Sequence, residues 1–138
     1  MTPILKNVLA VIAGFTIGAA VNMSLVILGP KLMTYPEGMD IMNPESYLAH
    51  VHLLEIQHYI MPFLAHALGT LIGAFFAARI AANRKSLFAM LIGAIFLLGG
   101  IQASRMIPAP TWFVATDLLL AYLPMAWLGW IFAGGNKS

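Results

Sequence analysis

Histidine and glutamate gather in one segment of this chain, at spacings that suit metal chemistry. His52, Glu55, His58 and His66 lie within it, and the three-residue spacing of Glu55 and His58 places them on adjacent turns of one helix face. Carboxylate-bridged metal sites in helix bundles use this spacing. We therefore predict that these four residues are metal ligands, with a divalent metal or copper as the candidate cofactor.

A straight helix limits how these ligands share one ion. His52 and His58 fall about 60° to either side of Glu55, so a single ion cannot contact both imidazoles. A complete site therefore needs ligands from another segment or from a second copy of the chain. The sequence does not decide which metal is bound or whether a cofactor is present.

Several other kinds of chemistry are excluded by what the sequence lacks. The chain has no cysteine, which removes disulfides, thiolate nucleophiles and cysteine-based metal sites. It carries no nucleophile elbow, phosphate-binding loop or zincin helix. Its seven Lys and Arg residues are scattered and form no basic patch, so we expect no nucleic-acid partner.

The composition indicates that lipid surrounds the elements that position these residues. Of the 138 residues 61% are hydrophobic and only 9% are charged, far fewer charges than a soluble domain carries. Four apolar stretches reach the roughly 20 residues that a membrane-spanning helix needs. We predict an all-α integral membrane four-helix bundle formed by a single domain, 1–138. Its spans are about 8–28, 61–81, 87–104 and 112–133, with an outer loop and helix at 29–60 and a short outer loop at 105–111.

The cations predict the orientation of the bundle. Lys6, Arg79, Arg84, Lys85 and Lys137 all fall at one end of the predicted spans. By the positive-inside rule this end is cytoplasmic, which gives an N-in/C-in topology in the inner or plasma membrane. Every acid and every histidine then lies in the outward half.

Breaks between the spans have local causes. Gly29–Pro30 should end the first helix, residues 83–86 should form a polar turn, and Pro108–Pro110 should separate the last two spans. Asn43 followed by Pro44 is a helix start. We therefore expect one long helix from 44 to about 82, an extracytoplasmic helical extension of the second span, kinked at Pro62.

Small residues predict which spans pack together. Gly14 and Gly18 lie on one stripe of the first span, and Gly69 and Gly73 on one stripe of the second. Such ladders let two membrane helices approach closely. We predict direct contact between the first two spans through these four glycines.

A layer of polar side chains is expected just inside the outer boundary. It consists of Asn22, His66, Gln102 and Asp117, with Arg105 at its edge. Polar groups at that depth are costly and need partners. Asp117 could pair with Arg105 or belong to a site, and Asn22 should face His66.

The sequence leaves several functions open. The foremost is an accessory or assembly subunit of a membrane complex, or a homo-oligomer, in contact with lipid and with other membrane proteins. The alternatives are a metal-binding membrane protein, an enzyme acting at the membrane interface, and a transporter of protons or small solutes. Whether the chain is an enzyme is undecided.

Overall fold

The computed structural model describes residues 1–135, which form helices and connecting loops and no strand. The α-helices are α1 (Pro3–Leu32), α2 (Pro44–His50), α3 (Ile60–Ile80), α4 (Lys85–Met106), α5 (Thr111–Leu120) and α6 (Leu123–Phe132). Two 3-10 helices, η1 (Val51–Leu53) and η2 (Ile56–Tyr59), lie between α2 and α3. Four stretches are long and apolar enough to cross a membrane. The prediction of an all-helical chain with four such stretches is confirmed.

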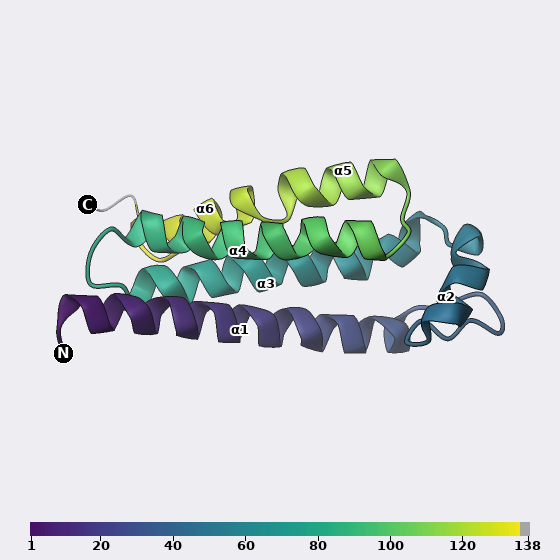
Figure 1. Ribbon diagram of the computed structural model, residues 1–138, viewed down its shortest axis with the longest axis horizontal. Helices are drawn as coiled ribbons and strands as arrows, with labels where there is room; N and C mark the ends of the chain where they lie inside the picture. The colour runs from purple at the N-terminus through teal and green to yellow at the C-terminus, as the bar shows by residue number, and fades with distance from the viewer. Residues whose placement is uncertain (136–138) are drawn as a thin grey trace.

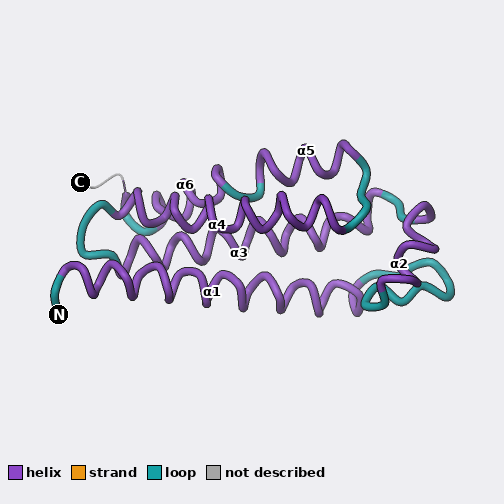
Figure 2. Tube along the Cα trace, in the orientation of Figure 1, coloured by secondary structure: helices purple, strands orange, loops and turns teal. Residues whose placement is uncertain are grey.

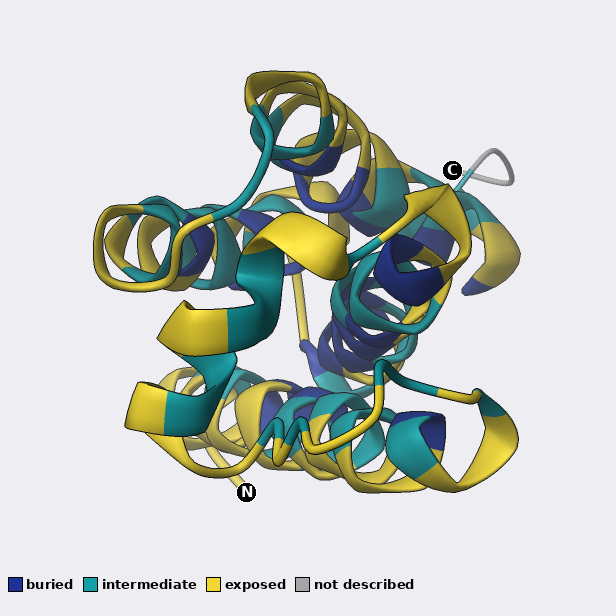
Figure 3. Ribbon diagram, turned by 90° about the vertical axis from the view of Figure 1, so that its right-hand side faces the viewer, coloured by how far each residue is buried: buried dark blue, intermediate teal, exposed yellow. Residues whose placement is uncertain are grey.

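The long helices run side by side, with α3 in the middle. It packs against α1, α4 and α6, so most of the buried residues come from it or face it. The start of α1 and the end of α6 lie at one end of the bundle, and α2 with its loops lies at the other (Figure 1). The trace in Figure 2 shows loops confined to the two ends and to the step between α5 and α6. Viewed from the α2 end, buried residues face inward and exposed residues face outward (Figure 3).

Glycines set the contact between α1 and α3. A Cβ atom on Gly18 would lie 2.6 Å from the carbonyl oxygen of Gly69, and one on Gly14 would lie 2.7 Å from that of Gly73. These distances are too short for any side chain, so the backbones of the two helices touch. The structure therefore places all four glycines of the predicted ladders in this contact.

The predicted helix from 44 to about 82 is wrong in its first half. Asn43 caps α2 as expected, its Oδ1 accepting hydrogen bonds from the N–H groups of Glu45 and Ser46. The chain then leaves the helix at Leu54 and Glu55, both of which are extended. Pro62 consequently lies in the first turn of α3, where its missing N–H costs nothing, and does not kink a continuous helix.

The predicted span 112–133 is also interrupted. It is divided at Ala121 and Tyr122 into α5 and α6, and the backbone of Tyr122 lies outside the helical region. Pro124 explains the break, because it has no N–H to donate to the carbonyl oxygen of Leu120, four residues earlier. The freed backbone is covered by protein, since Ala121 and Tyr122 are both buried.

The remaining predicted helix boundaries lie closer to those in the structure. Pro30 lies inside the last turn of α1, which continues to Leu32, so Gly29–Pro30 does not end that helix. The polar turn near residue 84 is present, and Arg84 has a positive φ of 44° there. Asn7 of α1 fastens this turn, accepting from Ala82 N–H and donating to Asn83 Oδ1. Lys137, which supports the predicted orientation, falls outside the described residues.

Candidate functional site

A hydrogen-bonded trio of side chains joins three helices in the half of the bundle nearer α2. His66 of α3 places its Nδ1 atom 2.8 Å from Oδ1 of Asp117 on α5. The second carboxylate oxygen, Oδ2, accepts a 3.0 Å hydrogen bond from the hydroxyl of Tyr122, which starts the turn into α6. The imidazole and the Tyr122 ring stack with centroids 5.8 Å apart. Asp117 is only 5% exposed, so both oxygens depend on these partners.

This arrangement fixes the chemistry of the imidazole. An ionised carboxylate only accepts hydrogen bonds, so Nδ1 of His66 carries the hydrogen and donates it. In the neutral ring Nε2 then keeps its lone pair. Within residues 1–135 no group donates to Nε2. Asp117 therefore orients His66 and leaves it one free acceptor atom.

The ring of His66 also forms part of a cavity wall. The cavity has a volume of about 250 Å³ and is bounded mainly by apolar and aromatic side chains. The lining residues come from α1 to α5 and from the loops around α2: Val26, Tyr35, Ile41, Tyr47, Leu54, His58, Tyr59, Pro62, His66, Gly100, Ala103, Ser104, Ile107, Ala109, Phe113, Val114 and Asp117. A mostly apolar cavity with a few convergent polar groups is the usual form of a small-molecule site.

The break in the fourth span creates this space. α6 packs closely on α3 and α4, where a Cβ on Gly93 would collide with Ala126, whereas α5 is stepped outward from the bundle (Figure 1). Gly100 of α4 lies directly against the ring of Tyr122 and leaves no room for a side chain there. The cavity begins where the helices separate, on the α2 side of Tyr122.

The connection between α2 and α3 covers the cavity. His58 is buried and accepts the N–H of Glu55 at Nδ1, 2.8 Å away, so its Nε2 carries the hydrogen and donates to the carbonyl oxygen of Thr34 at 3.0 Å. The ring of Tyr35 lies 5.1 Å from that of His58, centroid to centroid. His58 thus ties the loop after α1 to the start of α3.

Tyr47 fastens the same cover from the other side. Its hydroxyl donates to the carbonyl oxygen of Pro108, 3.1 Å away in the loop between α4 and α5. Burial raises the pKa of Tyr47 to about 12, with smaller contributions from the neighbouring Tyr59 and then Tyr35. The phenol is therefore held in its neutral, donating form.

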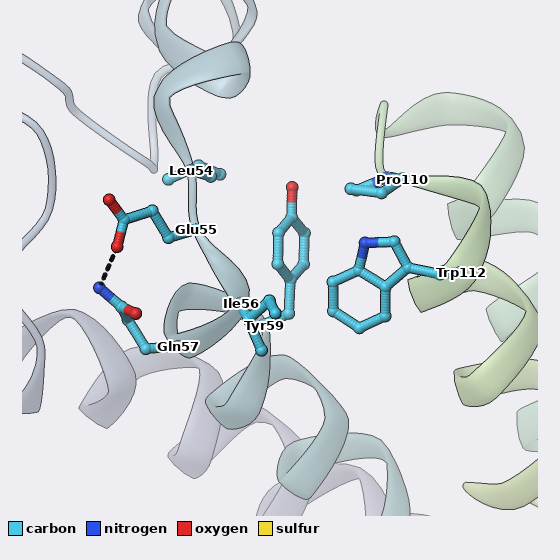
Figure 4. Close-up of a pocket in the computed structure, with 7 residues that line it drawn as sticks. All are labelled: Leu54, Glu55, Ile56, Gln57, Tyr59, Pro110 and Trp112. Carbon is cyan, nitrogen blue, oxygen red and sulfur yellow. Dashed lines mark hydrogen bonds between the residues drawn. The ribbon is translucent and has the colours of Figure 1, made fainter.

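The structure separates the four predicted metal ligands. His52 is exposed on η1, while both ring nitrogens of His58 are occupied by backbone groups. Glu55 is exposed and accepts a hydrogen bond from Gln57, and its carboxylate points away from Tyr59 and Trp112 (Figure 4). Over residues 1–135 no group of three or more His, Asp or Glu side chains comes together as a metal site would require. The break at Leu54–Glu55 is the physical reason, because it removes the common helix face.

The predicted polar layer is reduced to two of its members. His66 and Asp117 meet, but Gln102 and Arg105 are exposed. Gln102 follows the buried Gly100 by two residues, which turns it about 200° around α4, away from the side where Gly100 meets Tyr122. Asp117 is hydrogen-bonded to His66 and Tyr122 rather than to Arg105.

Asn22 takes a different position from the expected one. It packs against Gly69, one turn further along α3 than His66, where a Cβ on the glycine would lie 2.9 Å from its own Cβ. Its Oδ1 atom is buried and accepts no hydrogen bond from the described part of the chain. Asn22 therefore belongs to the contact between α1 and α3 and not to the His66–Asp117 site.

Sequence reasoning missed the role of Tyr122. Its hydroxyl is buried and completes the coordination of the Asp117 carboxylate. The signal was present, because a tyrosine in the middle of an apolar span needs a partner for its hydroxyl and Pro124 marks a break beside it. The hydroxyl of Thr70 donates to the carbonyl oxygen of His66 and supports that turn of α3.

Comparison with known proteins gives no further guide to the site. No protein-family model, curated protein or solved structure matches this chain.

Proposed function

We propose that this chain, which has the four apolar helices of a small membrane protein, binds a small and mostly apolar molecule in the cavity beside His66. The observation that carries the proposal is the 2.8 Å bond from His66 Nδ1 to Asp117 in the wall of a 250 Å³ apolar cavity. Burying a polar pair in apolar surroundings costs free energy, and ionisable residues inside membrane spans usually mark a functional site. The pair lies in the lining of the cavity, and Nε2 of its His66 ring is an acceptor atom that no group within residues 1–135 occupies.

The proposed orientation places this cavity in the outer half of the membrane. Lys6, Arg79, Arg84 and Lys85 lie at the end of the bundle where α1 begins, and the positive-inside rule assigns that end to the cytoplasm. The inner or plasma membrane is the proposed location. A ligand dissolved in the outer leaflet would then reach the cavity without crossing the bilayer.

A small apolar photoprobe tests the proposal. Trifluoromethyl-phenyl-diazirine, activated in nanodiscs that contain the protein, should label the cavity wall at Ala103 and Val114, as read by peptide mass spectrometry. Val114→Phe fills the cavity and should remove the labelling at Ala103. Leu119→Phe, on the exposed face of the same helix, is the matched control and should not.

Lipid-facing residues provide the internal standard. Leu98 and Leu119 are 67% and 71% exposed and should be labelled equally in the wild type and in Val114→Phe. Labelling confined to these two positions, with none in the cavity wall, would contradict the proposal.

A second candidate function is assembly with another membrane helix, as an accessory subunit of a complex or as a homo-oligomer. The observation that favours it is on α4: Gly99 has no heavy atom within 4 Å of its Cβ position, and Gln102 is exposed near it. Glycine and glutamine on a lipid-facing surface suit close helix contact with an interhelical hydrogen bond. Such a contact would leave the cavity open.

The oligomeric state tests this second candidate. Analytical ultracentrifugation in detergent should show a larger species that Gly99→Leu dissociates, whereas Leu98→Ala, on the same exposed face, should leave it intact. A protein that purifies without other subunits and is monomeric at all concentrations would contradict the assembly function.

A further inference from the structure

We propose that the cavity takes a phenol-type ligand, a single aromatic ring that bears a hydroxyl group and a short apolar tail, with the hydroxyl donating to Nε2 of His66. This inference rests on the proposed binding function and names the chemical class of the ligand. Three features of the site support it: the free acceptor atom, the aromatic walls and the size of the cavity.

The acceptor atom selects for a ligand that donates. Asp117 uses the only hydrogen on the neutral imidazole, so His66 cannot donate to the carbonyl or ether oxygen of a ligand. A hydroxyl group can donate to Nε2, whereas its methyl ether leaves that atom unsatisfied. The unmade bond should weaken binding about tenfold.

The trio also fixes the orientation of the His66 ring. Asp117 receives hydrogen bonds on both oxygens, from His66 and from Tyr122, and is itself buried. The imidazole is further held by its stacking on the Tyr122 ring. A carboxylate hydrogen-bonded to one ring nitrogen in this way fixes the histidine tautomer and leaves the other nitrogen as an acceptor. A phenol is a stronger hydrogen-bond donor than an aliphatic alcohol, so it makes the stronger bond to this acceptor.

Aromatic side chains line the side of the cavity nearer α2. The rings of Tyr59 and Phe113 lie 4.8 Å apart, and Tyr35 and Tyr47 belong to the same lining. Flat walls of this kind favour a flat ligand, because ring faces and edges pack against one another at such distances.

The volume limits the ligand to one ring. Sites for drug-sized molecules usually measure about 300–1,000 Å³, and this cavity is smaller. A ring with a short alkyl chain fits the space, while a sterol or a multi-ring molecule would have to displace α5 or the cover formed by His58 and Tyr47.

A set of matched probes tests the inference on the unmodified protein. The probes are para-heptylphenol, its methyl ether para-heptylanisole, and para-heptylcyclohexanol, which keeps the hydroxyl but lacks the aromatic ring. Affinities are measured from the ligand-dependent rise in melting temperature in one detergent. We expect the phenol to bind about tenfold more tightly than the ether, and more tightly than the cyclohexanol.

Variants assign the effect to the cavity. His66→Phe keeps a ring beside Tyr122 but has no acceptor atom, and should reduce the preference for phenol over ether to about twofold or less. His52→Gln, on the exposed η1, should retain the full preference. Val114→Phe should lose binding of every probe. Any rise in melting temperature that remains in this variant comes from partition of the probe into the detergent and is subtracted.

The outcomes separate this inference from the proposed function. Equal affinity for phenol and ether, both abolished by Val114→Phe, would overturn the phenol class and leave small-molecule binding intact. A cyclohexanol that binds as tightly as the phenol would likewise overturn the aromatic requirement. No binding of any probe, together with photolabelling confined to lipid-facing residues, would overturn the binding function itself.

Discussion

His66 Nδ1 lies 2.8 Å from Asp117 Oδ1, and this bond joins α3 to α5 at the level where the fourth span breaks. The two residues are 51 positions apart in the sequence. Because α5 is stepped away from the rest of the bundle, few other contacts hold it there. The bond therefore both positions the free acceptor atom and anchors the helix that closes the cavity.

Removing the Asp117 carboxylate should destabilise the protein. Asp117→Ala leaves the buried donors of His66 and Tyr122 without an acceptor, which costs about 1–3 kcal/mol. We expect a fall of this size in the free energy of unfolding, measured by SDS titration in mixed micelles. Thr116→Ala is the control, since the Thr116 hydroxyl bonds only to Trp112 of its own helix. Equal stability of the two variants would contradict an anchoring role for Asp117.

Adding a methyl group between α1 and α3 should also be destabilising. In Gly18→Ala the new Cβ would lie 2.6 Å from the Gly69 carbonyl oxygen, so the helices must separate, at a cost of about 1–3 kcal/mol. Gly99→Ala places the same methyl group in open space on α4 and should leave stability unchanged or slightly raised. The SDS titration compares the free energies of unfolding of the two variants. An unchanged free energy of unfolding in Gly18→Ala would contradict the close contact between α1 and α3.

This contact was predictable from sequence because its cause is local. Small residues four positions apart lie on one helix face whatever the tertiary structure, so the ladders at Gly14–Gly18 and Gly69–Gly73 reveal the interface directly. The prediction of one helix from 44 to 82 was wrong because its interruption depends on contacts that are distant in sequence. No residue between 51 and 59 is a strong helix breaker, and the chain turns there because His58 and Tyr47 bond to Thr34 and Pro108, which are distant in sequence.

The cover of the cavity should loosen when His58 is replaced. His58→Phe keeps a ring beside Tyr35 but removes the bonds to Glu55 N–H and to the Thr34 carbonyl oxygen. We expect faster hydrogen exchange at the amide of Glu55, by about tenfold, measured by mass spectrometry on the peptide covering 51–59. His52→Phe alters an exposed ring and should exchange as the wild type does. Unchanged exchange in His58→Phe would show that other contacts hold the cover.

High pH should release Tyr47. Burial raises its pKa from the ordinary value of 10 to about 12, so the unfolded state loses this proton first as the pH rises. The stability from neutral Tyr47 is therefore complete below pH 10 and is lost as the pH passes through about 12. The ultraviolet absorbance of tyrosinate measures this titration, as the difference between the wild type and Tyr47→Phe. A difference curve centred near pH 10 would contradict the burial of this phenol.

Some features of the functional site were also predictable from the sequence, and others were not. His66 and Asp117 were identifiable singly, because ionisable residues inside apolar spans require partners. Their pairing was not, because the partner of Asp117 depends on how α5 lies beside α3, and Arg105 was an equally available partner in the sequence. Pro124 was the available sign that α5 ends before α6. The predicted metal site depended on one uninterrupted helix through Glu55, and the break there separates its four ligands within residues 1–135.

Nitrogen NMR of the histidine rings, on protein labelled with nitrogen-15 at histidine, tests the central claim most directly. We predict that His66 carries its hydrogen on Nδ1 and a bare lone pair on Nε2, and that para-heptylphenol shifts the Nε2 resonance while para-heptylanisole does not. The His52 resonances should not respond to either probe. A hydrogen on Nε2 of His66 without ligand, or an Nε2 resonance that ignores the phenol when it is bound, would contradict the account.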